Sequence, residues 1–304
     1  MSKNKVGVKA VPKLNKLIRS SQILTFLDLR STNLTDAGTV LLGQGLVGNK
    51  TLLHLNLSKN DITQTGLESF APALQGTNLT ELDLSLNPLG NNGIKCLADN
   101  FTENFTKERR SLLGRGAECK LVKLNLSETK FSEHGGYYLM KSLQDYKNMQ
   151  CLILDYNHFG SENMHQLYRL IHSTRLQTLS INYCKLGETG GISIGDALCH
   201  SNHIKEIRAK RNEFRDKTAK AFAQAFEENC VVEKVDLSNN LINDSGGELI
   251  GLSLAVNVNL NHLNLRKNNL RFTSGAMFAQ SMKENRTIKC IKLQKNSINL
   301  SFLE

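Results

Sequence analysis

One pattern of apolar and polar positions recurs along most of this chain of 304 residues. Its clearest copy runs from Leu260 to Leu270 (LNHLNLRKNNL), with leucine at positions 1, 4, 6 and 11 and asparagine at position 9. The alternation at positions 4 to 6 predicts a short strand with one buried side, and the polar residues after it predict a turn. Ten copies, spaced by 27 or 28 residues except for one spacing of 42, open at Leu24, Leu52, Leu79, Leu121, Met149, Leu176, Ile204, Val232, Leu260 and Ile288.

The second half of each copy has helical spacing. Apolar residues stand at positions 19 and 23, and a separation of four places both on one face of a helix. Position 19 holds Leu42, Phe70, Leu97, Leu139, Leu167, Ile194, Phe222, Ile250 and Phe278, and position 23 holds Leu46, Leu74, Phe101, Leu143, Ile171, Leu198, Phe226, Leu254 and Met282. Each copy is therefore expected to be one strand followed by one helix that packs on the strands.

Two residue types mark the ends of the expected helices. Glycine recurs at position 15, where the turn enters the helix, as Gly38, Gly66, Gly93, Gly135, Gly190 and Gly246. Asparagine recurs at position 26, where we expect it to end the helix in the left-handed conformation, as Asn49, Asn104, Asn229, Asn257 and Asn285.

Strands and helices differ in width, since stacked strands lie about 4.8 Å apart and packed helices need about 8 to 10 Å. This mismatch predicts a curved stack, with ten parallel strands on the concave face and helices on the convex face. The period, the form L-x-L-S-x-N-x-L at 55–62, 82–89 and (with Val first) 235–242, and the helix entered through glycine resemble the ribonuclease-inhibitor-like subfamily of leucine-rich repeats. The resemblance covers about residues 12–304 and implies an α/β solenoid shaped as a horseshoe.

A solenoid lengthens its core without thickening it, so we expect a single domain over residues 12–304. Residues 1–11 are predicted to be a basic mobile tail, and residues 12–22 a capping helix that begins at Pro12. The long spacing predicts an insertion at about residues 102–120, either a tolerated surface loop or a protrusion that contacts a partner. No capping helix is expected after the tenth strand, so this end is frayed, truncated or covered by another chain.

The net charge of +10 is unevenly placed. Residues 1–20 carry six Lys and Arg and no acid, residues 204–304 carry 16 against 11 acids, and the remainder nets about −1 (16 − 17). Seven cysteines without a framework-like spacing, and an N-terminus without a signal-like apolar stretch, favour a cytoplasmic protein with reduced thiols. No apolar run reaches the roughly 20 residues that span a bilayer. The family resemblance also permits association with the cytoskeleton or a cilium.

Position 9 forms a ladder that we interpret as structural. After the strand the backbone turns with unpaired amides and carbonyls, and an inward Asn side chain can satisfy both. The ladder holds Asn60, Asn87, Asn157, Asn212, Asn240, Asn268 and Asn296, with Thr32, Thr129 and Cys184 in the other copies. Aspartate at position 5 recurs in the subfamily and is also treated as framework; here it is Asp28, Asp83 and Asp236.

Positions 3, 5 and 7 should point to the concave face, and position 8 should lie at its edge. In the last four copies these positions carry eight basic residues: Arg208, Lys210, Arg211, Lys234, Arg266, Lys267, Lys292 and Lys295. Like charges this close are mildly destabilising, which makes a role for them more plausible. The cluster is a solvated face screened by salt, a site for an acidic protein segment, or a site for nucleic acid or a phosphoinositide. An acidic protein segment fits better than nucleic acid, because the cluster holds no aromatic residue on which bases could stack.

Two tyrosines offer a second candidate contact. Tyr156 and Tyr183 stand at position 8 of adjacent copies and are amphipathic anchors of the kind found at protein interfaces, unless their exposure is incidental. The N-terminal part of the same face carries Phe26, Asp28, Glu81 and Asp83, so the face is expected to change from acidic to basic.

Signals for catalysis are weak. Residues 43–51 superficially match a phosphate-binding loop, but they end a helix, whereas such a loop lies between a strand and the following helix. Cys199, His200 and His203 lack a predictable fourth zinc ligand. We therefore expect no metal, no cofactor and no enzyme activity.

The sequence thus favours a non-enzymatic interaction scaffold that binds an acidic partner through its concave face, with a cytoskeletal or axonemal assembly as one setting. Two functions implied by the resemblance stay open: activation of a GTPase in the manner of the Ran activator, and ligand sensing or inhibition, as in ribonuclease inhibitor. The Ran activator usually has an acidic C-terminal tail, which is absent here, and a chain of charge +10 would repel basic ribonucleases.

Overall fold

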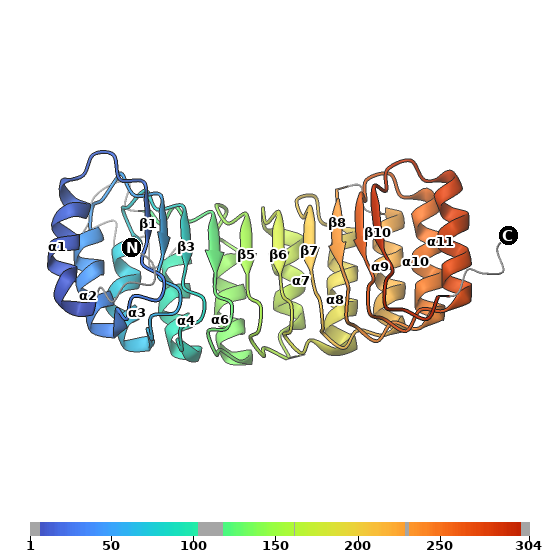
Figure 1. Cartoon of the computed structure of the whole chain (residues 1–304), viewed down its shortest axis with the longest axis horizontal. Helices are drawn as coiled ribbons and strands as arrows, with labels where there is room; N and C mark the ends of the chain where they lie inside the picture. The colour runs from blue at the N-terminus through green and yellow to red at the C-terminus, as the bar shows by residue number, and fades with distance from the viewer. Residues whose placement is uncertain (1–6, 103–117, 161, 229–230, 299–304) are drawn as a thin grey trace. The chain divides into compact units, whose positions relative to one another are not determined.

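The computed structural model describes residues 7–102, 118–160, 162–228 and 231–298. The chain divides into two compact units, Met1–Asn157 and His158–Glu304. Both units repeat the same element, a three-residue strand followed by a turn and a helix (Figure 1). The prediction of one continuous domain stays a prediction.

The described residues of the first unit form five strands and their helices. The strands are β1 (Phe26–Asp28), β2 (His54–Asn56), β3 (Glu81–Asp83), β4 (Lys123–Asn125) and β5 (Cys151–Ile153). The helices are α1 (Gly7–Ser20), α2 (Thr35–Leu46), α3 (Gln64–Phe70), α4 (Gly90–Ala98) and α6 (Glu133–Leu143), with 3-10 turns η1 (Ala71–Leu74) and η2 (Asp99–Phe101) after α3 and α4.

The described residues of the second unit also hold five strands. These are β6 (Thr178–Ser180), β7 (Glu206–Arg208), β8 (Lys234–Asp236), β9 (His262–Asn264) and β10 (Cys290–Lys292). The helices are α7 (Met164–Ser173), α8 (Gly187–Cys199), α9 (Asp216–Glu228), α10 (Asp244–Val256) and α11 (Phe272–Glu284).

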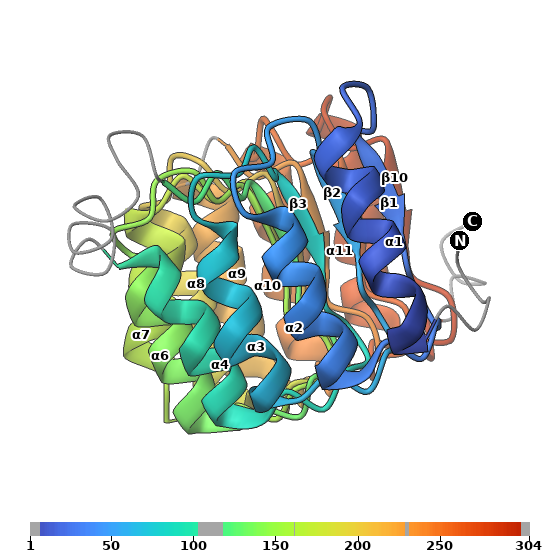
Figure 2. The same cartoon turned by 90° about the vertical axis from the view of Figure 1, so that its left-hand side faces the viewer.

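Within each unit neighbouring strands are parallel and follow the order of the sequence. Their pairing matches equal positions of successive copies, so that Leu27 pairs with Leu55 and Leu55 with Leu82. Consecutive helices pack against each other on one side of the strands, as the row from α1 to α6 shows (Figure 2). The predicted α/β leucine-rich-repeat architecture with parallel strands is confirmed.

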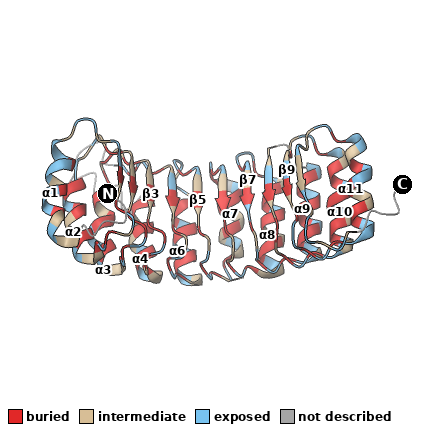
Figure 3. Cartoon of the chain, viewed as in Figure 1, coloured by how far each residue is buried: buried red, intermediate tan, exposed pale blue. Residues whose placement is uncertain are grey.

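The core lies between the strands and the helices, where both layers bury one face (Figure 3). The predicted helix residues at positions 19 and 23 are buried, with Met282 half-buried. Positions 4 and 6, in the strand and just after it, are also buried in the first nine copies, as Leu55 and Leu57 show, and half-buried in the tenth, at Ile291 and Leu293. Each such side chain contributes roughly 1.5 to 3 kcal/mol of apolar burial, which is why the apolar positions recur so regularly.

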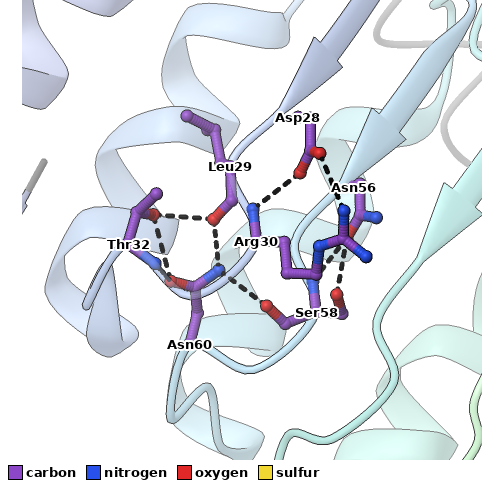
Figure 4. Close-up of polar contacts among 7 residues, drawn as sticks. All are labelled: Asp28, Leu29, Arg30, Thr32, Asn56, Ser58 and Asn60. Atoms are coloured by element: carbon purple, nitrogen blue, oxygen red, sulfur yellow. Dashed lines mark hydrogen bonds and ion pairs between the residues drawn. The ribbon is translucent and has the colours of Figure 1, made fainter. Parts of the chain in front are cut away.

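The asparagine ladder holds successive turns together, as predicted. Asn60 is fully buried, and its amide nitrogen donates to the carbonyl of Leu29 in the preceding copy at 2.7 Å (Figure 4). The same nitrogen donates to the carbonyl of Leu57 in its own copy at 3.0 Å. Its Oδ1 accepts from the backbone amides of Thr32 (2.9 Å) and Leu34 (3.2 Å). One side chain therefore pairs with backbone donors and acceptors of two successive turns.

Position 5 is also framework, as expected. The carboxylate of Asp28 accepts from the amide of Arg30 at 2.9 Å (Figure 4), and that of Asp236 accepts from the amide of Ser238 at 2.8 Å. A side chain that caps the amide two residues later stabilises the start of the turn.

The first helix begins earlier than predicted. Helix α1 starts at Gly7 rather than at Pro12, so residues 7–11 are helical and do not form a tail. Val11 is fully buried and lies on one face with Leu14 and Ile18, so the apolar stripe extends before the proline. The tail prediction for residues 1–6, and most of the insertion at about 102–120, lie outside the described residues.

The expected role of asparagine at position 26 is wrong. Asn257 and Asn285 follow their helices with φ of −69° and −68°, so neither adopts the left-handed conformation. Instead Asn285 donates to the carbonyl of Leu254 (2.6 Å) in the preceding copy and accepts from the amide of Ile288 (2.8 Å) in the next. The residue is a second inter-repeat bridge. Asn104 and Asn229 lie outside the described residues.

A side chain at position 13 caps the helix of the following copy. Asp244 accepts from the amides of Arg271 (2.8 Å), Thr273 (3.1 Å) and Ser274 (2.9 Å) at the start of α11. Burial alone would raise the pKa of Asp244, but these hydrogen bonds outweigh it and lower the pKa to about 2. Asp36 and Asn91 make equivalent caps in the first unit.

These caps explain the glycine at position 15. A Cβ atom on Gly246 would lie 2.7 Å from the carboxylate of Asp216, and one on Gly66 would lie 2.6 Å from that of Asp36. Both contacts are shorter than real Cβ atoms show, so a side chain there would displace the cap.

Candidate functional site

The strands of the second unit bring several predicted residues to one face, opposite to the helices. The pairing of β7 to β10 aligns Glu206, Lys234, His262 and Cys290 in one row, and Arg208, Asp236, Asn264 and Lys292 in the next. We call these two rows the strand centre. The side chains of Arg208, Lys234 and Lys292 are exposed on it, and neighbouring strands lie about 4.8 Å apart.

The strand centre carries mixed charge. Nε of Arg208 donates to Oε1 of Glu206 at 2.6 Å, which neutralises the pair. Asp236 accepts from Nδ2 of Asn264 at 3.0 Å and lies beside Arg208 in the pairing of β7 with β8. Sequence reasoning passed over Glu206, although it stands two residues before Arg208 on a strand and therefore on the same face.

The turn that follows each strand carries a different set of charges. Positions 7 and 8 of the last four copies hold only basic and neutral residues, and we call the basic ones the basic rim: Lys210, Arg211, Arg266, Lys267 and Lys295. All five are exposed except Lys210, which is half-buried. Among the residues that the structure describes, none of the five forms an ion pair within 4.0 Å. Their charge is therefore available to a partner.

The backbone of the rim has an unusual conformation. At position 8 all ten copies, each within the described chain, have φ between 54° and 62°. The amide of Arg211 donates to the carbonyl of Ser238 (3.1 Å), and that of Lys267 donates to the carbonyl of Gln294 (3.0 Å). These bonds continue the strand pairing past the strand ends, so the rim side chains start from a fixed backbone.

Tyr183 joins the basic rim. Nζ of Lys210 lies 5.5 Å from the centre of the Tyr183 ring, and Cζ of Arg211 lies 5.1 Å from it. Both distances are typical of cation–π contacts. The eight basic residues include no aromatic residue, but they have an aromatic neighbour, because position 8 of one copy reaches positions 7 and 8 of the next.

Tyr156 lies in the first unit, where its side chain is 50% exposed and its φ is 60°. Tyr183 lies in the second unit, so the joint tyrosine surface stays a prediction.

The hollows over the strands are small. One of about 190 Å³ lies over the strand centre, beside Arg208, Lys234 and Asp236. One of about 290 Å³ lies over β1 to β5, beside Phe26, and there Glu81 pairs with Lys123 at 3.2 Å. Both are below the roughly 300 to 1,000 Å³ of a small-molecule site, so they suit single side chains of a partner.

The thiols of Cys119 and Cys199 are held in the protonated form. Burial raises the pKa of both to about 11, and the nearby Glu228 adds to the effect at Cys199. Neither is therefore a thiolate nucleophile near neutral pH. Among the described residues no group of three or more His, Cys, Asp or Glu side chains is arranged to hold a metal ion. Cys199, His200 and His203 therefore do not form such a group.

Comparison with known proteins agrees with the fold. Residues 20–43, 48–71, 77–98, 172–195 and 228–251 match the family model described as Leucine Rich repeat. NACHT, LRR and PYD domains-containing protein 14 of Homo sapiens is 28% identical over 228 residues, which cover 73% of this chain and 20% of that protein. Ribonuclease inhibitor of Sus scrofa is 27% identical over 200 residues, which cover 64% of this chain and 41% of the inhibitor. The chain thus spans about a fifth of the first relative and about two fifths of the second.

Two solved structures share the fold at low sequence identity. A chain of the TLR13–ssRNA13 complex has a TM-score of 0.57 and 19% identity, and the match covers 95% of this chain and 36% of that one. A chain of the yeast Rad7 and Elc1 complex has a TM-score of 0.52 and 16% identity, and the match covers 96% of this chain and 75% of that one.

Repeated strands and helices, joined by an asparagine ladder, define a leucine-rich-repeat solenoid. The matched segments and relatives support a leucine-rich-repeat protein of the ribonuclease-inhibitor-like kind. Proteins of this fold are typically binding modules. None of the helices in the described ranges is both long and apolar enough to cross a membrane.

Proposed function

We propose that this chain is a non-enzymatic interaction module whose second unit binds an acidic segment of a partner protein on its strand face. The observation that carries the proposal is the basic rim, where five cations have no ion-pair partner among the described residues. Cations on a preorganised surface attract an acidic partner over a distance and disfavour basic ones, so they raise the association rate and select the partner.

The choice of an acidic protein over single-stranded RNA rests on the aromatic content of the face. Sequence-tolerant binding of single strands uses several aromatic side chains on which successive bases stack. In the second unit the rim offers Tyr183, over whose ring two cations already lie. A carboxylate-rich segment needs no stacking and can use every rim cation.

A labelled oligoglutamate peptide, measured by fluorescence anisotropy against the full chain, tests the proposal. Changing Arg208, Arg211, Arg266 and Lys267 together to Glu should abolish binding and leave the circular dichroism spectrum unchanged. The matched control reverses four exposed cations elsewhere on the second unit: Arg215, Lys217, Lys220 and Lys283. This control has the same net charge and should keep most of the affinity.

Undiminished binding by the strand-face variant, or an equal loss in the control, would reject the strand face as the site. Tighter binding of a labelled oligouridine than of the oligoglutamate would assign the face to nucleic acid instead. Activation of a GTPase and inhibition of a ribonuclease are supported by no feature of the described strand face. A cytoplasmic location and a place in a cytoskeletal or axonemal assembly stay predictions, as does docking of another chain at the C-terminal edge.

A further inference from the structure

We propose that the acidic segment lies along the basic rim, across the ends of β7 to β10, rather than over the strand centre. This inference rests on the proposed function and assigns the residues that make the contact. It divides the eight basic residues of the face into two sets: Lys210, Arg211, Arg266, Lys267 and Lys295 bind the segment, whereas Arg208, Lys234 and Lys292 do not.

The first reason is charge. Over the strand centre, Arg208 is paired with Glu206, and Asp236 stands in the same row as Arg208 and Lys292. An incoming carboxylate would therefore meet two carboxylates among three cations. At positions 7 and 8 of the same copies it meets five cations and no carboxylate. The rim is the more favourable place for an anionic chain.

The second reason is the backbone at position 8. Left-handed backbone is adopted readily by Gly and less often by Asn or Asp, and other residues adopt it at a cost. Of the ten residues that hold it at position 8, only Asn239 is of this kind. The turn thus imposes the conformation on any residue, and the framework does not select the side chain. Arginine or lysine in three of the last four copies calls for a role outside the framework.

The third reason is rigidity. The amide of Tyr183 donates to the carbonyl of Lys210 at 2.8 Å, and the amide of Asn239 donates to that of Arg266 at 2.8 Å. With the equivalent bonds of Arg211 and Lys267, each turn is tied to the next. A fixed backbone lowers the entropy lost when side chains are ordered by a partner.

The spacing of the rim defines the length of the segment. Position 8 is basic on the turns after β7, β9 and β10 and neutral after β8. With strands about 4.8 Å apart, these cations are separated by about 10 Å and then about 5 Å. An extended chain rises about 3.3 Å per residue, so a segment of about five residues spans them. We infer an extended acidic segment that runs across the strand direction.

Tyr183 marks one end of this track. Its ring lies beneath the cations of Lys210 and Arg211 at the turn after β6. An aromatic face orders both cations through the ring quadrupole, and a phenylalanine would serve equally well. The tyrosine is a positioning residue for the first two rim cations.

Two double variants of the full chain separate the rim from the strand centre. Lys267→Gln with Lys295→Gln removes two rim charges, and Lys234→Gln with Lys292→Gln removes two charges of the strand centre. Both change net charge equally, and all four lysines are exposed. With the labelled oligoglutamate peptide we expect the rim variant to bind about tenfold more weakly, and the centre variant within about twofold of the unchanged chain.

The outcomes are distinguishable. Greater weakening in the centre variant, or equal weakening in both, would overturn the rim assignment and leave the proposed function standing. No binding of the peptide by the unchanged chain would overturn the proposed function itself. Tyr183→Ala should weaken binding about threefold, whereas Tyr183→Phe should not; an equal loss in both would contradict a role for the ring. Urea unfolding of each variant verifies that it is folded.

Discussion

Removing one rung of the asparagine ladder should destabilise the second unit strongly. Asn240 is 4% exposed and lies under the turn between β8 and α10. Its amide nitrogen donates to the carbonyls of Leu237 (2.9 Å) and Ala209 (3.2 Å). Its Oδ1 accepts from the amides of Asn212 (2.8 Å) and Phe214 (3.2 Å). Asn240→Ala deletes these four bonds and a longer one to the carbonyl of Ser238 (3.4 Å). The carbonyl of Leu237 keeps a bond from Asn268 (3.0 Å), whereas the carbonyl of Ala209 and the amides of Asn212 and Phe214 lose this partner.

The expected cost follows from these bonds. A hydrogen bond contributes roughly 0.5 to 1.5 kcal/mol net, so four of them bracket about 2 to 6 kcal/mol. Water that enters the small space left by the side chain recovers part of this, and we expect a loss of about 3 kcal/mol. With a urea dependence of about 2.5 kcal/mol per molar, the unfolding midpoint falls by about 1 M.

Urea unfolding followed by circular dichroism measures this loss. Asn202 is a matched control, because it is exposed, lies in the same unit and makes no side-chain hydrogen bond recorded for the described residues. Asn202→Ala should shift the midpoint by less than about 0.2 M. A shift for Asn240→Ala no larger than that of the control would show that the ladder does not stabilise the stack.

Three further predictions concern the caps and the strand face. Because the pKa of Asp244 is about 2 in the folded chain and 3.8 without the fold, its contribution is present above about pH 4 and is lost as pH falls toward 2. After allowance for solvent screening, this contribution to the free energy of unfolding is about 1 kcal/mol. Between pH 5 and pH 2 the unfolding free energy of Asp244→Asn should therefore fall less than that of the unchanged chain. Gly246→Ala places a Cβ 2.7 Å from Asp216 and 2.8 Å from Ala219, and should lower the unfolding free energy by about 1 to 3 kcal/mol; a neutral result in urea would contradict the close approach. Glu206→Gln removes a negative charge from the strand face and should tighten oligoglutamate binding by up to about twofold through long-range attraction, so weaker binding would argue against electrostatic attraction on this face.

The fold could be predicted from the sequence because each copy requires similar residue types at the same positions. Leu55 and Leu57 must be apolar to fill the core, and Asn60 must offer both a donor and an acceptor to the turns. A substitution at any of these positions would leave a cavity in the core or an unpaired backbone group. Similar residue types therefore recur from copy to copy, and their spacing can be recognised in the sequence. The start of α1 was placed too late because Pro12 suggested a helix start, although Val11 continues the apolar stripe.

Contacts between copies were harder to predict. Asp244 caps a helix that begins at Phe272 in the next copy, and Asn285 bridges to Leu254 in the copy before it. From the sequence, Asn285 has a role only within its own copy, as the end of a helix, and Asp244 has no assigned role. The contact of Tyr183 with Arg211 was missed for the same reason. Comparison of each position with those 27 to 31 residues away is the signal that would find them.

Zero-length cross-linking with a carbodiimide tests the central claim most directly. The reagent joins carboxylates of a bound oligoglutamate peptide to lysines in contact with it, and mass spectrometry locates the joined residues. The account predicts cross-links at Lys210, Lys267 and Lys295. Cross-links concentrated at Lys234 and Lys292, or at Lys217 and Lys220 away from the strand face, would contradict it.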